Sequence, residues 1–218
     1  MKHQKHNKSN SRSLDHIVDY CAEVGVVLRN LPYGTIELVI QTLIQAHDAG
    51  RNVFVFGNGG SAALASHMAC DLGKGMAEIS PKPNRVLSLT DNVALITAWA
   101  NDLNYEEVFS QQLKSLLRPA DVAFAISSSG NSPNVLSALR IAKSLDAFTI
   151  GLTGFDGGKV RPLCDLCVVV PSNNTQIIED AHTVVAHGMF SVLRSRMQSS
   201  TLMRAQPAPL RAGAAAGN

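Results

Sequence analysis

The sequence of 218 residues carries little charge: Asp, Glu, Lys and Arg make up 17% of it, against about a quarter in a typical globular protein. The net charge of +2 is small and the basic residues are scattered, which argues against a nucleic-acid interface. No apolar run reaches the roughly 18 residues of a membrane span, and the basic segment 1–8 lacks the apolar core of a signal peptide. We expect a cytoplasmic protein without a nucleic-acid or membrane partner. The low charge also favours a homo-oligomer.

Cysteine is scarce, with four residues in the chain. Cys164 and Cys167 form a C-x-x-C motif, but no second pair completes a zinc site of the structural kind. The motif runs directly into Val168, Val169 and Val170. We therefore interpret both cysteines as buried residues at the edge of a strand.

Helical and strand patterns alternate along most of the chain. Helices are expected at 14–29, capped by Ser13, and from Thr35 to near Gly50, because apolar residues recur there every three to four positions. Strands are expected at 52–56, 85–89, 121–126, 147–152 and 166–170. Further helices are expected at 61–73, 91–101, 105–117, 133–145, 158–163 and 175–196. Strands that are apolar throughout and alternate with helices indicate a parallel sheet covered on both faces.

The predicted fold is α/β: a single three-layer α/β/α domain with a central five-stranded parallel sheet and extra N-terminal helices. It occupies residues 14–196. The flanking segments 1–13 and 197–218 are rich in small and polar residues, and we expect both to be disordered tails.

Two polar segments rich in glycine and serine each follow a predicted strand. Residues 57–61 (Gly-Asn-Gly-Gly-Ser) are called the glycine turn, and residues 127–132 (Ser-Ser-Ser-Gly-Asn-Ser) are called the serine loop. Both lie where a strand ends and a helix begins. The N–H groups and the dipole of a helix N-terminus favour the binding of phosphate there. The glycine turn lacks the lysine of a P-loop and the spacing of a dinucleotide-binding turn. A phosphate monoester, such as a sugar phosphate, remains as the predicted ligand.

Ionisable residues interrupt two otherwise apolar helices. His67 and Asp71 lie at i and i+4 on the helix that follows the glycine turn, so they share a face. Glu179 and His187 are eight residues apart on the last helix, about 80° around its axis. Two histidines and two carboxylates suit zinc or another divalent first-row metal. His182 is an alternative ligand to His187, and spacing does not decide between them.

These motifs, with Asn101-Asp102 and the segment 152–158 (Leu-Thr-Gly-Phe-Asp-Gly-Gly), resemble a SIS (sugar isomerase) domain over about residues 14–196. Within that superfamily the chain is similar to phosphoheptose isomerases, which convert sedoheptulose 7-phosphate to D-glycero-D-manno-heptose 7-phosphate. The resemblance implies a homotetramer with active sites at subunit interfaces. It also implies a divalent metal, usually Zn²⁺, held by His67, Asp71, Glu179 and His187, and so favours His187 over His182.

The resemblance further assigns substrate contacts. The serine loop would hold the phosphate through Ser127, Ser128, Ser129 and Ser132. The glycine turn and the Asn-Asp pair would contact the sugar through Asn58, Gly59, Gly60, Ser61, Asn101 and Asp102, and Glu179 would also face the substrate.

The chain departs from the family pattern at three positions. Glutamate is usual at Asp71 and glutamine is common at Glu179, so one carboxylate is shorter and another is added. An arginine that usually follows the first of these acids is absent, and Lys74 lies one position out of register. The identity of the catalytic base is therefore left open.

The expected reaction is an aldose–ketose isomerisation through a cis-enediol. Asp71 would remove the proton beside the carbonyl, or Glu179 would if Asp71 is committed to metal, and His187 would return a proton. The alternatives are an isomerase of another ketose phosphate, or a non-catalytic SIS module that binds a phosphosugar or a protein, as in the replication-initiator-associating group. A SIS-type regulator would need a DNA-binding module, and no pattern of one is visible in 1–13 or 197–218, so we do not expect a regulator.

Overall fold

The computed structural model describes residues 3–80 and 82–205, with side chains from residue 14 to residue 199. Five parallel strands form one sheet in the order β2-β1-β3-β4-β5. Their bounds are β1 (Val53–Gly57), β2 (Val86–Ser88), β3 (Val122–Ser127), β4 (Phe148–Thr153) and β5 (Leu166–Val169). The five-stranded parallel sheet predicted from the sequence is confirmed.

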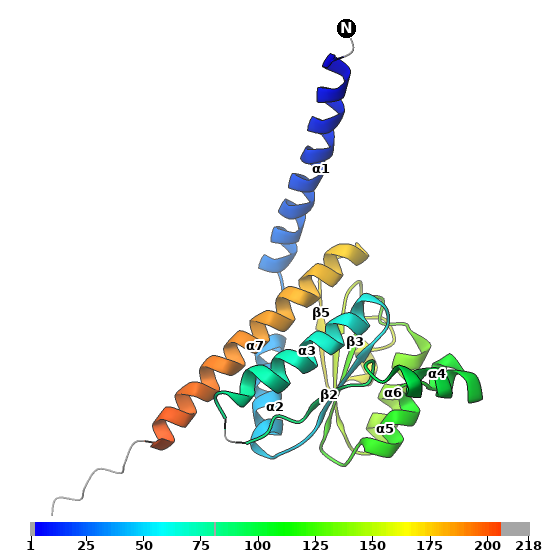
Figure 1. Ribbon diagram of the computed structural model, residues 1–218, viewed down its shortest axis with the longest axis vertical. Coiled ribbons are helices and arrows are strands. Elements are labelled where there is room, and N and C mark those ends of the chain that lie inside the picture. Colours follow the sequence, from blue (N-terminus) through cyan, green and yellow to red (C-terminus); the bar gives the residue numbers. More distant parts are fainter. Residues whose placement is uncertain (1–2, 81, 206–218) are drawn as a thin grey trace, which may run out of the picture.

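Helices cover both faces of the sheet (Figure 1). One face carries α2 (Tyr33–Asp48), α3 (Gly60–Ala77) and α7 (Thr175–Ala205). The other carries α4 (Val93–Asp102), the short helix η1 (Tyr105–Glu107), α5 (Ser110–Leu116), α6 (Pro133–Ser144) and η2 (Arg161–Leu163). The remaining helix, α1 (His3–Arg29), contacts α7 and then projects away from the body (Figure 1).

Alternate residues of the central strands fill two separate apolar cores. On β1, Val53 and Val55 face α2, α3 and α7, whereas Phe54 and Phe56 face α5 and α6. All five residues of β1 and all six of β3 are buried. A strand buried on both faces has no polar side, which explains why these strands appear in the sequence as continuous apolar runs.

The order of the strands places two loops side by side. The chain moves from β1 outward to β2, then returns to β3 on the other side of β1, so β1 and β3 flank the point where the order reverses. Their register pairs Gly57 with Ile126, so both strands end at the same level. Ligands of open α/β sheets bind at the carboxyl edge beside such a point.

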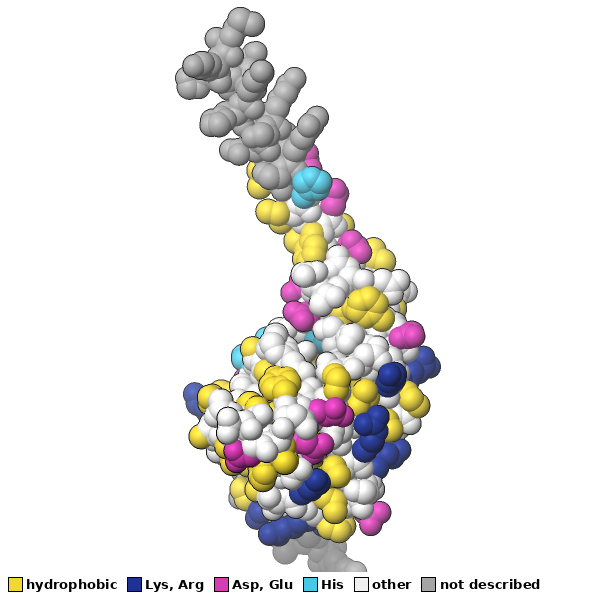
Figure 2. All heavy atoms as spheres, turned by 90° about the vertical axis from the view of Figure 1, so that its right-hand side faces the viewer, with side chains coloured by type: hydrophobic (Ala, Val, Ile, Leu, Met, Phe, Trp, Pro, Cys, Tyr) yellow, Lys and Arg dark blue, Asp and Glu magenta, His cyan; other side chains and the backbone are white. Residues whose placement is uncertain are grey.

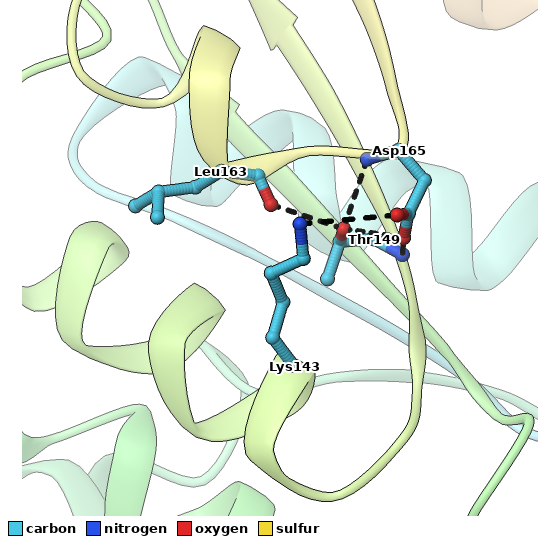
Figure 3. A network of polar contacts seen from close by, with 4 residues as sticks. All are labelled: Lys143, Thr149, Leu163 and Asp165. Atoms are coloured by element: carbon cyan, nitrogen blue, oxygen red, sulfur yellow. Dashed lines mark hydrogen bonds and ion pairs between the residues drawn. The ribbon is translucent and has the colours of Figure 1, made fainter.

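A polar network fixes the opposite edge of the sheet (Figure 3). The backbone N–H of Thr149, at the start of β4, donates to Asp165 Oδ2 at 2.8 Å, and the Thr149 hydroxyl lies 2.7 Å from the same oxygen. Lys143 Nζ lies 3.9 Å from the other carboxylate oxygen. The amino ends of β4 and β5 are thereby tied together, far from the glycine turn and the serine loop.

Both terminal helices are longer than the sequence predicts. Helix α1 begins at His3 rather than at residue 14, so Ser13 lies inside it, and α7 continues to Ala205. Segments 3–13 and 197–205 continue these two helices, and neither contains glycine or proline to stop a helix. Pro32, not Thr35, precedes the first residue of α2. Residues 1–2 and 206–218 lie outside the described part, and the domain boundaries stay a prediction.

Among the described residues, no helix combines the length and hydropathy that crossing a bilayer requires. Cys164 and Cys167 are half-buried and unpaired. Burial raises the pKa of both thiols, as in cysteines that serve in packing. Their predicted burial at the edge of β5 is thus partial.

Candidate active site

The backbone of the glycine turn lies close to its neighbours. Gly59 has φ of +54°, a conformation that favours glycine. A Cβ on Gly57 would lie 2.6 Å from the carbonyl oxygen of Ile126, and one on Gly60 would lie 2.9 Å from Glu179 Oε2. Helix α3 begins at Gly60, so the first N–H groups of an 18-residue helix border this turn.

The serine loop leads from β3 into α6 and has hydroxyls close together. Ser127 Oγ lies 3.3 Å from Ser132 Oγ, and Ser129 Oγ accepts a hydrogen bond of 3.2 Å from the Asn131 N–H. Gly130 has φ of +63° and approaches the Gly157 carbonyl so closely that a Cβ would overlap it. The loop therefore presents hydroxyls and backbone N–H groups at a helix N-terminus, which is the arrangement predicted for phosphate.

Helices α3 and α7 bring two histidines and a carboxylate together. His67 Nε2 lies 2.8 Å from His187 Nε2, and Asp71 Oδ2 lies 3.3 Å from the first nitrogen and 4.0 Å from the second. One ligand atom from each residue lies within 4.8 Å of the other two. The cluster is open to solvent, since both histidine side chains are 51% exposed.

Glu179 lies apart from this cluster, between the two loops. Its Oε1 accepts a hydrogen bond of 3.5 Å from Ser128 Oγ, and its Oε2 faces Gly60. Of the four predicted metal ligands, the structure thus brings His67, Asp71 and His187 together and directs the Glu179 carboxylate toward the predicted substrate loops.

His182 is excluded from the cluster. It is 1% exposed, and its Nε2 lies 3.1 Å from the Thr153 carbonyl oxygen at the end of β4. Burial lowers its pKa to about 4, so the ring is neutral at physiological pH. The structure thus places His187, and not His182, beside His67 and Asp71, and the choice of His187 as a metal ligand stays a prediction.

Asn101 and Asp102 end α4, as expected, but remain exposed. Asn101 Nδ2 donates to Asp102 Oδ1 at 3.0 Å, and neither side chain contacts the glycine turn or the serine loop in the hydrogen bonds found among the described residues. The nearby Tyr105 does reach the turn, with its hydroxyl 3.1 Å from Asn58 Oδ1.

Two residues of this region are missed by the sequence analysis. Tyr105 is one, and the other is Asn134, a buried amide in the first turn of α6 that faces Asn58. A polar residue at a helix start is ordinary, so the only available signal is that Asn134 follows the serine loop after a single proline.

The cluster fits a divalent metal by its donor set. Two imidazole nitrogens and a carboxylate oxygen are ligands that zinc accepts, with other positions left to solvent or substrate. Tetrahedral zinc with bonds of about 2.0–2.1 Å separates two nitrogens by about 3.3 Å. The 2.8 Å between the two Nε2 atoms would have to increase by roughly half an ångström, a small movement for exposed side chains.

Comparison with known proteins identifies the family of the chain. The model of the SIS domain family matches residues 19–154. The phosphoheptose isomerase of Paramagnetospirillum magneticum is 42% identical over 155 residues, which cover 69% of this chain and 78% of that protein. The phosphoheptose isomerase of Helicobacter pylori is 41% identical over 153 residues, covering 70% and 77%.

Solved structures give the same result. The structure of a phosphoheptose isomerase from Neisseria gonorrhoeae superposes with a TM-score of 0.78 at 30% identity, covering 84% of this chain and 98% of that one. A phosphoheptose isomerase from Francisella tularensis gives the same values. The sugar isomerase domain of a transcription factor from Sphaerobacter thermophilus, at 17% identity and a TM-score of 0.60, shares the fold alone. The chain belongs to the SIS domain family and, within it, to the phosphoheptose isomerases.

Proposed function

We propose that this protein is an aldose–ketose isomerase that interconverts sedoheptulose 7-phosphate and D-glycero-D-manno-heptose 7-phosphate. The observation that carries the proposal is the meeting of three parts at one edge of the sheet. These parts are the glycine turn, the serine loop and the Glu179 carboxylate of α7, and the cluster of His67, Asp71 and His187 lies further along α3 and α7. Two relatives named phosphoheptose isomerase are 42% and 41% identical over 155 and 153 residues.

The serine loop is the proposed phosphate site. Hydroxyls and N–H groups at the start of α6 would bind the phosphate far from the reacting carbons, and this binding energy would hold the sugar chain in place. The sugar would then extend along the glycine turn toward Glu179 and the histidine cluster. Gly59, Gly60 and Ser61 would offer backbone N–H groups to its oxygens.

A divalent metal, zinc by preference, is proposed at His67, Asp71 and His187. When bound there, the ion would polarise substrate oxygens and stabilise negative charge on them. The two histidine nitrogens and the Asp71 carboxylate oxygen that face one another would then be occupied by the ion. Glu179, whose carboxylate lies elsewhere, would supply a fourth ligand only by turning away from Ser128.

Glu179 is the proposed base of this chain, in a departure from the family pattern: glutamine is common at this position, and Asp71, which takes the place of the family's usual glutamate, lies in the cluster with the two histidines. The Glu179 carboxylate removes the proton from C1 of the ketose, and the C–H electron pair becomes the C1=C2 bond as the carbonyl oxygen on C2 takes a proton from water. The O1 proton is then lost to water to form the aldehyde, and the same carboxylate returns its proton to C2. Both carbons of a cis-enediol present one face, so a single carboxylate between Ser128 and Gly60 suffices. The alternative, in which Asp71 is the base and His187 returns the proton, requires both to be free of metal.

Self-association into a homotetramer is proposed from the exposed apolar surface. Helix α4 is rich in apolar residues yet has none buried, and Val93 is 66% exposed. Apolar side chains are also exposed along α1 where it leaves the body (Figure 2). A second copy that covers α4 would enclose Asn101 and Asp102. Because a sugar phosphate does not cross a bilayer unaided, we propose that the enzyme acts in the cytoplasm.

The function is tested with purified protein whose metal content has been measured. Sedoheptulose 7-phosphate is added and the aldose is followed by NMR, with a chelated sample alongside. Turnover that vanishes on chelation and returns with zinc is expected. Saturable binding of the sugar phosphate without turnover would contradict the proposal and support a binding role.

The base is identified by two variants. Glu179→Gln should lose turnover and keep its metal, whereas Asp71→Asn should lose metal along with turnover. Full activity of Glu179→Gln would exclude Glu179 as the base and leave Asp71 in that role. Metal retention by Asp71→Asn would exclude the proposed ligand set.

A further inference from the structure

Asn134 is the most deeply buried side-chain amide near the two loops among the described residues. It lies at the second position of α6 and is 2% exposed. Its Nδ2 donates to Asn58 Oδ1 at 2.8 Å, and Asn58 Nδ2 donates in return to Asn134 Oδ1 at 2.8 Å. Asn134 Oδ1 also accepts from the Val135 N–H at 3.0 Å. The two amides form a reciprocal pair that joins the glycine turn to the start of α6, directly after the serine loop.

The Asn58 side chain is nearly saturated by protein partners. Its oxygen accepts from Asn134 and from the Tyr105 hydroxyl, and one of its two N–H donors is used by Asn134. A primary amide offers one oxygen with two lone pairs and two N–H groups. One N–H therefore remains for a substrate. Most of the hydrogen-bonding capacity of Asn58 holds three segments together: the glycine turn, η1 and the first turn of α6.

We propose that Asn134 is a positioning residue for the isomerisation and acts through Asn58. The inference rests on the proposed function. By holding the Asn58 amide, Asn134 sets the glycine turn, which contacts the sugar, against the serine loop, which holds the phosphate. The substrate spans both loops, so their relative position decides where the reacting carbons lie beside Glu179. Tyr105 holds the same amide oxygen from the exposed side.

The chemistry requires an amide at position 134. Aspartate keeps the size and accepts from Asn58 Nδ2 and the Val135 N–H, but it has no N–H for Asn58 Oδ1. Two oxygens would then face each other where a 2.8 Å hydrogen bond now lies. Asn58 Oδ1 would keep the Tyr105 hydroxyl as a donor but would face an oxygen in place of an N–H, so the turn would shift until the two oxygens separate.

The test compares Asn134→Asp with a matched change elsewhere. Asn84 is also a packed amide, bonded to His47 and to the Leu72 carbonyl at the far edge of the sheet, so Asn84→Asp makes the same chemical change away from the loops. Turnover of sedoheptulose 7-phosphate, thermal unfolding and amide hydrogen exchange are measured for both. Tyr105→Phe serves as a graded third variant.

Asn134→Asp is expected to lower kcat by ~10-fold or more with little change in KM, because misplacing reacting groups by an ångström lowers rates by up to ~100-fold. Exchange at residues 58–60 should rise. Tyr105→Phe should lower kcat by a few-fold and Asn84→Asp should not alter it, even where its unfolding temperature falls equally.

Wild-type kcat in Asn134→Asp would overturn the proposal, as would equal losses of kcat in both aspartate variants. If the wild-type protein does not turn over the sugar phosphate, the proposed function fails and exchange alone decides. Faster exchange at 58–60 in Asn134→Asp then supports the link between the loops, and unchanged exchange refutes it.

Discussion

Replacing Gly60 with alanine should separate activity from stability. The new Cβ would lie 2.9 Å from Glu179 Oε2 and 3.3 Å from Cδ, where ordinary van der Waals contact begins at 3.4 Å. The carboxylate would therefore move by about 0.5 Å (3.4 less 2.9), and its 3.5 Å hydrogen bond from Ser128 would be lost. If a 1 Å misplacement lowers a rate by up to ~100-fold, half of that shift should lower kcat by ~10-fold.

The fold should tolerate the same change. Gly60 is not among the glycines with positive φ, and alanine is the better helix former. The displaced atoms belong to the end of a flexible side chain. Unfolding by urea should therefore give a free energy equal to or slightly above that of the wild type, while steady-state kinetics show the loss.

Gly73→Ala is the matched control on the same helix. A Cβ there meets nothing within 4 Å, so this variant gains helix propensity of up to about 1 kcal/mol without touching Glu179. Unchanged kinetics are expected. Wild-type kcat in Gly60→Ala, or a loss shared by Gly73→Ala, would refute the role assigned to the Glu179 carboxylate.

Three further predictions concern stability and assembly. Because burial lowers the pKa of His182 from 6.5 to about 4, between these pH values the unfolded chain binds a proton at His182 and the folded chain does not. The free energy of unfolding should then fall by up to about 3 kcal/mol as the pH drops from 6.5 to 4. Urea unfolding of His182→Gln should show a weaker dependence on pH. An unchanged pH profile in this variant would contradict the assignment. Tyr20 Oη donates to Asp180 Oδ2 at 2.6 Å, so Tyr20→Phe should speed hydrogen exchange in α1. The free energy of unfolding should fall by less than about 1 kcal/mol, since the pair is exposed. Unaltered exchange would mean that this bond does not anchor the helix. Val93→Asp should leave the subunit folded and reduce the assembly seen by sedimentation, and an unchanged mass would remove α4 from the interface.

The sheet and its two loops were predictable because their signals are local. Runs such as Val53–Phe56 are apolar at every position, and the glycine and serine segments that follow them mark the ends of strands. Parallel pairing then requires that adjacent strands end at one edge, so the loops meet. The helix ends at His3 and Ala205 differ from the predicted ends because a polar composition does not stop a helix where no glycine or proline interrupts it.

The arrangement within the site was less predictable because it depends on distant packing. His182 and His187 lie about 140° apart on a helix, and only the docking of α7 decides which one faces α3. Glu179 turns to Gly60 because that residue lacks a Cβ. The pair of Asn58 and Asn134 joins positions 76 residues apart, and no local pattern signals it.

The two histidines of the cluster are made at different times during synthesis. His67 is made early and meets His187, 120 residues later, only when α7 docks on α3. A chain stopped before this last helix would carry both loops but neither Glu179 nor His187, and it would expose the apolar face that α7 covers. Such a nascent chain cannot carry out the proposed chemistry on a sugar phosphate. Activity therefore reports that the C-terminal helix has been made and has folded onto the sheet.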